Sequence, residues 1–166
     1  MNPYIAAPFL VVVALVQSTL SQRLQIGAVW PDFMLLVVVS WALLGHLTEA
    51  LVWSLAGGIV IDLTSGGPFG GTAFALMAAT LAAAAMAEGV FHGRAILPIV
   101  TAFVATLAFH GAYLLASLLV GQTVDGLDAL LRIALPAAVY NAALSLPVYG
   151  LMAAIDRRIK PKPLRW

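Results

Sequence analysis

The feature that most constrains this chain is a series of long apolar segments that carry almost no charge. Hydrophobic residues make up 63% of the 166 residues and charged residues only 9%, with a mean hydropathy of +1.03. A soluble domain usually carries about a quarter charged residues. The composition therefore predicts an integral membrane protein, in which almost no sequence is left over for a soluble domain.

Six apolar segments approach the length needed to cross a bilayer, which is roughly 20 residues. The first is interpreted as a span and not as a cleaved signal peptide, because no basic residue precedes its apolar core. The connections between segments are short, so successive helices should be antiparallel neighbours. We predict an all-α bundle of six transmembrane helices, at approximately Pro3–Leu20, Pro31–Leu44, Thr48–Thr64, Phe69–Ala87, Ala95–Val120 and Ala129–Ile155.

The basic residues predict how this bundle is oriented. Most of them follow the sixth segment, and basic residues in short loops favour the cytoplasmic side. We therefore expect a transmembrane domain over residues 1–156 and a basic cytoplasmic tail over residues 157–166, with the N-terminus cytoplasmic as well. The tail is either a topology signal or a patch for anionic lipids, to which each basic residue would add about 1 kcal/mol. Its basic residues are Arg157, Arg158, Lys160, Lys162 and Arg165.

An acid at the end of the third segment stands out among its apolar neighbours. Asp62 lies near the predicted outer end of this helix, where the helix dipole disfavours negative charge. The following loop offers compensation, because Ser65, Gly66 and Gly67 can turn back and present backbone N–H groups to the carboxylate. Pro68 then stiffens the entry to the next helix. The sequence leaves two compatible interpretations: a self-capped hairpin, or a docking site for a partner or ligand.

Two polar side chains fall inside the fifth and sixth segments. His110 lies ten residues before Val120, and Asn141 lies nine residues after Arg132. At 1.5 Å per residue their depths below the outer ends agree to within about 2 Å. We therefore expect His110 and Asn141, with Tyr140 beside them, to share one polar layer facing the bundle. Packing hydrogen bonds of roughly 0.6 kcal/mol each are a simpler explanation than a proton relay, for which the interior lacks a chain of acids and bases.

Other residues predict how the helices pack. Pro136 and Pro147 are expected to kink the last helix. Small residues in the third and fourth segments would allow close helix contacts, including contact with a partner's transmembrane helix. Four tryptophans, most of them near predicted helix ends, are interpreted as interfacial anchors: Trp30, Trp41, Trp53 and Trp166.

No catalytic motif is present in the sequence. There is no cysteine, no Walker loop, no nucleophile elbow and no His-Glu-x-x-His. The three histidines are scattered and predict no metal site. We accordingly expect no enzyme activity, no cofactor and no nucleic-acid partner.

Two blocks of the sequence resemble a known family, and because the length and the predicted number of spans also fit, the resemblance covers nearly the whole chain. A Pro-Asp pair opens the second segment, and an Asp-Leu-x-Ser-Gly-x-Pro-x-Gly motif closes the third. The last segment adds Tyr140–Asn141, Pro147 and a basic tail. This pattern is similar to that of MreD, the rod shape-determining membrane protein of bacteria. The matching positions of the first block are Pro31, Asp32, Asp62, Leu63, Ser65, Gly66, Pro68 and Gly70.

The resemblance implies a non-enzymatic part of the cell-elongation machinery in the bacterial inner membrane. The partners it implies are MreC and, in a larger assembly, the peptidoglycan synthase formed by RodA and a class B transpeptidase, together with the MreB filament. It also implies an architecture similar to the six-helix substrate-binding subunits (S-components) of energy-coupling-factor transporters.

Two other functions remain open from the sequence. A vitamin-type transport subunit would need a polar cavity open to the outside, and a lipid-handling role is also possible. Candidate residues for such a cavity are Gln17, Ser18, Thr19, Gln22, Asp32 and Asp62.

Overall fold

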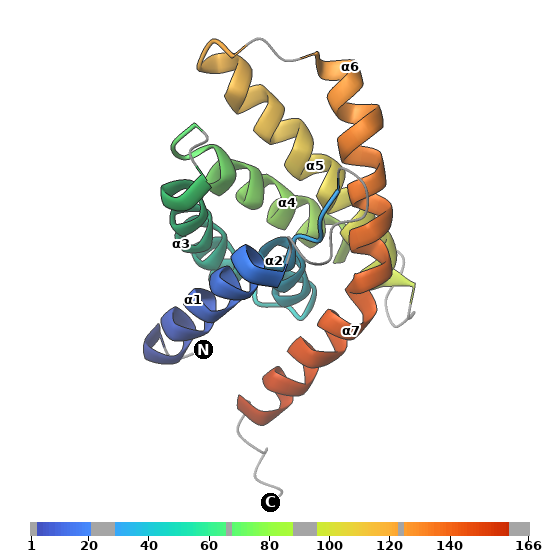
Figure 1. Ribbon diagram of the computed structural model, residues 1–166. Helices are drawn as coiled ribbons and strands as arrows, with labels where there is room; N and C mark the ends of the chain where they lie inside the picture. The colour runs from blue at the N-terminus through green and yellow to red at the C-terminus, as the bar shows by residue number, and fades with distance from the viewer. Residues whose placement is uncertain (1–2, 21–28, 66–67, 88–95, 123–124, 160–166) are drawn as a thin grey trace, which may run out of the picture.

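In the computed structural model, residues 3–20, 29–65, 68–87, 96–122 and 125–159 are described, and nearly all of them are helical (Figure 1). The last three elements follow one another without a break and form one continuous helical segment over Gly126–Ile159. The elements are α1 (Pro3–Leu20), α2 (Phe33–Leu43), α3 (Leu47–Ser65), α4 (Gly71–Ala87), α5 (Leu97–Leu119), α6 (Gly126–Ala129), the π-helical turn η1 (Leu130–Ala134) and α7 (Leu135–Ile159).

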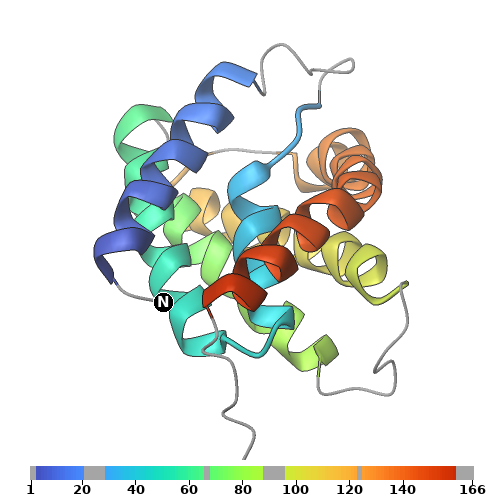
Figure 2. The ribbon, with the colours of Figure 1, turned by 90° about the horizontal axis from the view of Figure 1, so that it is seen from below.

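Helix α2 is the centre of the bundle. Its 11 residues are apolar on every side, and all but Phe33 and Leu43 are buried. A helix that is hydrophobic all round must be surrounded by protein or lipid. Here α1, α3, α4, α5 and α7 all contact it, and Figure 2 shows it enclosed by the other helices. At 1.5 Å per residue α2 is about 16 Å long, roughly half the thickness of the hydrocarbon core.

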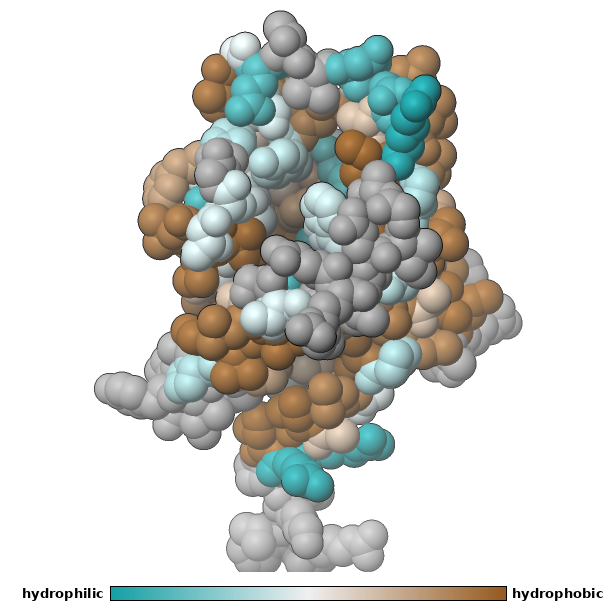
Figure 3. Space-filling view, in the orientation of Figure 1, coloured by the Kyte–Doolittle hydropathy of each residue, from teal (hydrophilic) through white to brown (hydrophobic). Residues whose placement is uncertain are grey.

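Three described helices are long and apolar enough to cross a membrane: Leu47–Ser65, Leu97–Leu119 and Gly126–Ile159. Shorter apolar helices cover Pro8–Gln17, Phe33–Leu43 and Gly71–Ala87. On the face drawn in Figure 3, hydrophilic residues gather over α6 and at the lower end of α7, with hydrophobic residues between them. The prediction of an all-helical membrane protein is confirmed, whereas six complete crossings remain a prediction.

Small residues bring α3 and α4 into direct backbone contact. A Cβ atom built on Gly58 would lie 2.6 Å from the backbone nitrogen of Ala73 and 2.8 Å from its Cβ. The buried face of α4 continues this pattern with Ala75, Ala79 and Ala83. The prediction that small residues allow close helix contacts is confirmed on these faces, whereas contact of small residues with a partner's transmembrane helix stays a prediction.

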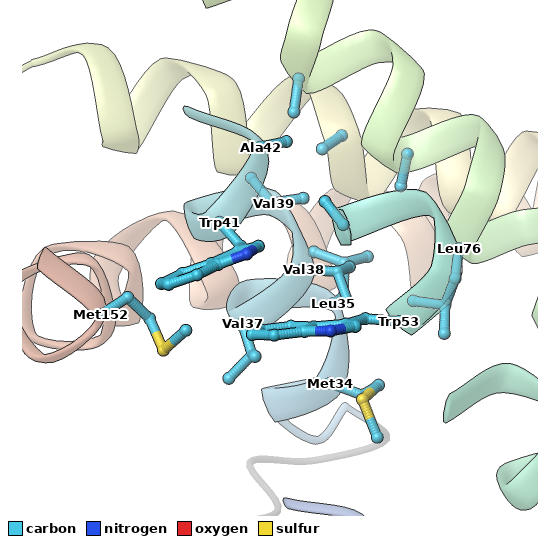
Figure 4. Packing of buried hydrophobic residues seen from close by; sticks show 14 of the residues in the cluster. Met34, Leu35, Val37, Val38, Val39, Trp41, Ala42, Trp53, Leu76 and Met152 are labelled. Carbon is cyan, nitrogen blue, oxygen red and sulfur yellow. The ribbon is translucent and has the colours of Figure 1, made fainter. Parts of the chain in front are cut away.

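Aromatic rings fill the core beside α2, as Figure 4 shows for Trp41 and Trp53. The two indole rings are stacked with centroids 4.9 Å apart, and the His46 ring also stacks on Trp41, at 4.6 Å. Trp41 and Trp53 are only 1% and 4% exposed. Our interpretation of these two residues as interfacial anchors is wrong, because tertiary packing buries rings that lie near helix ends in the sequence. Trp30, by contrast, is 56% exposed.

At the end of the bundle where α7 ends, side-chain contacts join elements that are far apart in the sequence. His46, in the turn between α2 and α3, lies 2.8 Å from a carboxylate oxygen of Asp156. The indole nitrogen of Trp41 donates a hydrogen bond of 2.9 Å to Glu49. The α2–α3 turn is thus tied to the last turns of α7.

The last helix changes direction along its length in both ribbon views. Pro136 follows the π-helical turn, in which the Leu135 N–H donates to the Leu130 carbonyl five residues back. In a regular α-helix the Pro136 ring would meet the carbonyl of Arg132, and the wider turn relieves this crowding. Pro147 lies inside α7. A bent last helix agrees with expectation, and the assignment of the bend to either proline stays a prediction.

The predicted boundary at residue 156 falls inside α7. The helix continues through Arg157 and Arg158 to Ile159, because arginine is a good helix former and basic charge is favourable at a helix C-terminus. Lys160 and Lys162 lie outside the described residues.

Candidate functional site

The acid at the end of α3 caps the next helix. Asp62 is 5% exposed, and its carboxylate accepts hydrogen bonds from the backbone N–H groups of Thr72 (3.1 Å) and Ala73 (3.4 Å). These groups belong to the first turn of α4, whose N–H groups have no partner within the helix. A charge that is unfavourable at the C-terminus of α3 is therefore favourable at the N-terminus of α4.

The hairpin between α3 and α4 differs from the expected self-capped loop in its bonding. We expected Ser65, Gly66 and Gly67 to supply the N–H groups; among the described residues the carboxylate accepts from Thr72 and Ala73. Gly66 and Gly67 lie outside the described residues, and Ser65 is the last residue of α3.

The second half of the same loop is a tight turn. The Gly71 N–H donates to the Pro68 carbonyl at 2.9 Å, and Gly70 has φ +86°. A side chain at Gly70 would meet nothing within 4 Å, so its backbone conformation, and not lack of space, favours glycine there.

A second capping acid begins α2. Asp32 is its N-cap, and its Oδ1 accepts hydrogen bonds from the Leu35 N–H (2.9 Å) and from the Gln17 side-chain amide (3.0 Å). The Gln17 carbonyl oxygen in turn accepts from the Met34 N–H at 2.9 Å. The pair Pro31–Asp32 therefore positions the start of the central helix, and Gln17 joins α1 to that start.

Asn141 connects this capped end to α5 and α7. Its side-chain oxygen accepts from the Asp32 backbone N–H at 3.0 Å, and its nitrogen donates to the Thr106 hydroxyl at 3.2 Å. His110 Nδ1 lies 2.9 Å from the Thr106 carbonyl. His110 and Asn141 thus lie in one layer with Thr106 between them. We call Gln17, Asp32, Thr106, His110 and Asn141 the polar layer.

Only some residues of the polar layer could be predicted from the sequence. His110 and Asn141 were expected together from their depths, and Tyr140 next to them is half-buried. Gln17 was noted only as a candidate cavity residue, and Thr106 was missed. A Thr in a helix commonly bonds back to the fourth preceding carbonyl, as Thr106 does to Ala102 at 2.7 Å, so it carries no distinctive signal in the sequence.

Two adjoining cavities lie beside the polar layer. The larger, about 420 Å³, lies between the starts of α2 and α4, the end of α3, the second half of α5 and the α6–η1 segment. The smaller, about 60 Å³, lies between Val29–Asp32, α5 and the start of α7. Figure 3 shows the hollow between α5 and α6 at the top of the molecule. The larger volume lies within the usual range of ligand pockets, about 300–1,000 Å³.

The described polar side chains form no metal centre. Within those ranges, no group of three His, Asp or Glu residues could hold a metal ion. Asp62 and Asp32 both cap helices, and Asn141 and Thr106 join helices to one another. The polar groups of this bundle therefore serve chiefly to hold it together.

The long apolar helices and the buried polar layer define an integral membrane protein of the all-helical class. The sequence model of one family, described as rod shape-determining protein MreD, matches residues 1–157. The chain therefore belongs to the MreD family, as its motifs predicted, and has a role in rod shape determination at the inner membrane. This is a family of shape-determining proteins and not a known enzyme family. No curated protein and no solved structure gives a significant match.

Proposed function

We propose that this protein is a non-enzymatic membrane scaffold that binds MreC and through it influences the peptidoglycan synthase, RodA with its class B transpeptidase. Contact with the MreB filament would be indirect. The observation that carries the proposal is the family match over residues 1–157. The use of polar side chains for capping and packing supports a structural role over a chemical one.

The proposed topology has six spans and both termini in the cytoplasm. Arg157 and Arg158, on the last turn of α7, support a cytoplasmic end there under the positive-inside rule. The α3–α4 hairpin would then face outward. Because the chain has no cysteine, single cysteines introduced at Phe69 and at Arg158 provide a direct test with a membrane-impermeant thiol reagent. We expect labelling from outside at position 69 and only after permeabilisation at position 158.

The α3–α4 hairpin is the proposed docking feature, with its roles divided between buried and exposed residues. Asp62 is buried and bonded to the backbone of α4, so it would act by stabilising the conformation of the loop. Phe69 and Leu63 are 73% and 69% exposed beside it. These two side chains are the part of the hairpin that a partner's first extracellular residues would contact.

A pair of substitutions separates the two roles. Asp62→Ala removes the acceptor for two backbone N–H groups and should lower the free energy of unfolding by about 1–2 kcal/mol, and abundance with it. Phe69→Ser should leave stability unchanged but reduce the amount of MreC recovered with the tagged protein from mild detergent. Co-purified MreC, normalised to the level of the tagged protein, is the measurement.

Leu119→Ser is the matched control, since Leu119 is also an exposed apolar residue (79%) at the end of a helix. It should leave MreC recovery unchanged. Normal recovery with Phe69→Ser, or an equal loss with Leu119→Ser, would show that the hairpin is not the docking site.

The larger cavity favours a second candidate function, a substrate-binding subunit of a small-molecule transporter with an S-component-like bundle. Gln17 and Asp32 line this cavity, as that function requires, whereas Gln22 and the side chain of Ser18 are outside the described part of the chain. Recovery of an ATPase module in place of MreC and the synthase would support this alternative.

A further inference from the structure

The two cavities beside the polar layer adjoin each other and differ in size. They share four lining residues: Trp30, Asp32, His110 and Ile133. A water molecule takes about 30 Å³ of liquid volume, so the smaller cavity has room for a group of one or two heavy atoms. The larger adds the aromatic walls of Phe109 and Tyr113. This arrangement suits a molecule with a compact polar head and an apolar body.

The polar groups at the junction of the cavities mostly accept hydrogen bonds. Gln17 and Leu35 both donate to Oδ1 of Asp32, so Oδ2 retains capacity to accept from a ligand. The Thr106 carbonyl can only accept, so His110 Nδ1 must carry the proton in their contact. In the neutral ring Nε2 is then an acceptor. A ligand head that meets these two side chains must bring hydrogen-bond donors.

Charge narrows the class of ligand further. Asp32 is the acid among the described lining residues of either cavity, and none of those residues is Lys or Arg. A phosphate or pyrophosphate head would meet a carboxylate that no cation among the described lining residues offsets, which disfavours a wall-precursor carrier here. A cation is favoured instead by the carboxylate and by the face of Trp30.

We propose that the two cavities bind one amphipathic amine, with its ammonium group in the smaller cavity against Asp32 and His110 and its apolar body in the larger. Such an ammonium belongs either to a free organic amine or to the head of an aminolipid such as phosphatidylethanolamine, whose own ammonium offsets the charge of its phosphate. The proposal does not depend on MreC binding.

A matched series of probes tests the requirement for positive charge. Phenethylammonium, 2-phenylethanol and phenylacetate share a body and differ in the head group. We expect phenethylammonium to bind the purified full-length protein at least about tenfold more tightly than phenylacetate, measured by thermal shift and tryptophan fluorescence. Equal or tighter binding of phenylacetate would overturn the proposal.

Substitutions test each cavity separately. Asp32→Asn should weaken phenethylammonium binding about tenfold while keeping α2 capped, because Asn is also a good N-cap residue. Asp156→Asn, at the opposite end of the bundle, should not change binding. Ala134→Leu adds volume at a buried residue that lines only the larger cavity, so it should weaken phenethylammonium but not methylammonium. Unchanged phenethylammonium binding in both Asp32→Asn and Ala134→Leu would refute the site.

An experiment in lipid nanodiscs distinguishes an aminolipid from a soluble amine as the ligand. The protein is released from discs that contain equal amounts of phosphatidylethanolamine and phosphatidylglycerol and is analysed by native mass spectrometry. If a lipid supplies the ammonium group, phosphatidylethanolamine should stay bound to the protein, and added phenethylammonium should displace it. Binding of the free amine without lipid enrichment would support a soluble ligand. Preferential retention of phosphatidylglycerol that Asp32→Asn leaves unchanged would contradict the proposal.

Discussion

Gly58→Ala should destabilise the protein more than Gly57→Ala, the same addition of one methyl group at the preceding residue. The new Cβ would be closer than van der Waals distance to the backbone of Ala73, so α3 and α4 must move apart. Overpacking of this kind costs about 1–3 kcal/mol, and a contact with backbone falls at the upper end because no rotamer change relieves it. The free energy of unfolding in mixed detergent micelles containing increasing SDS provides the measurement.

Gly57→Ala is the control for this prediction, because both changes gain the same helix propensity, about 1 kcal/mol relative to glycine. At Gly57 the added atom would meet Sδ and Cε of Met34 at 2.7 and 2.9 Å. These are the far end of a flexible side chain, which can turn away, so this variant should stay within about 1 kcal/mol of the parent.

A second substitution tests whether the backbone of Ala73, and not its methyl group, causes the destabilisation by Gly58→Ala. Ala73→Gly should not rescue Gly58→Ala, because the backbone atoms of Ala73 remain in place when its methyl group is removed. Rescue by Ala73→Gly, or equal stability of the two single glycine variants, would show that α3 and α4 are not in close backbone contact.

Asn141→Leu should destabilise the bundle by about 2–4 kcal/mol, although leucine has nearly the same size. Asn141 is 1% exposed and accepts from the Asp32 N–H while donating to Thr106. Leucine would leave the Asp32 N–H without its acceptor, and each buried polar group left unsatisfied costs about 1–3 kcal/mol. The measurement is again SDS-driven unfolding, with thermal aggregation in detergent as an independent check.

Val139→Leu is the matched control on the same helix, because Val139 is 61% exposed. It should leave stability within about 0.5 kcal/mol of the parent. If Asn141→Leu is as stable as the parent, the polar layer does not hold α2 to α7.

The sequence and the structure agree most closely where the physical signal is local. Apolar segments of sufficient length predict helices in a membrane whatever their neighbours are, and the last helix was placed within a few residues at each end. The depth of His110 and Asn141 also followed from counting along each helix, since the rise per residue is constant. The sequence offered a capping role for Asp62 as one of two interpretations, whereas the Pro31–Asp32 pair was noted through the family resemblance and its role as the cap of α2 came from the structure.

Partners across the bundle were not predictable in the same way. Asp62 accepts hydrogen bonds from the first turn of α4, ten and eleven residues further along the chain. Trp41 and Trp53 lie near helix ends in the sequence yet stack in the core. The small residues of α3 and α4 could have faced lipid, a partner or each other. In each case the local pattern was compatible with several neighbours.

The sequence by itself determined the membrane class, the approximate helices, the family and the residues on which its motifs depend, because these rest on composition and on spacing along one chain. Only the tertiary structure decided that α2 is a short central helix, that Gly58 meets Ala73, and that Gln17, Asp32, Thr106, His110 and Asn141 form one layer beside two cavities. The physical reason is that the sequence of an apolar helix without a polar face does not indicate which side contacts lipid and which side contacts protein. Hydrophobicity drives each segment into the membrane, and close packing with a few hydrogen bonds then selects its neighbours.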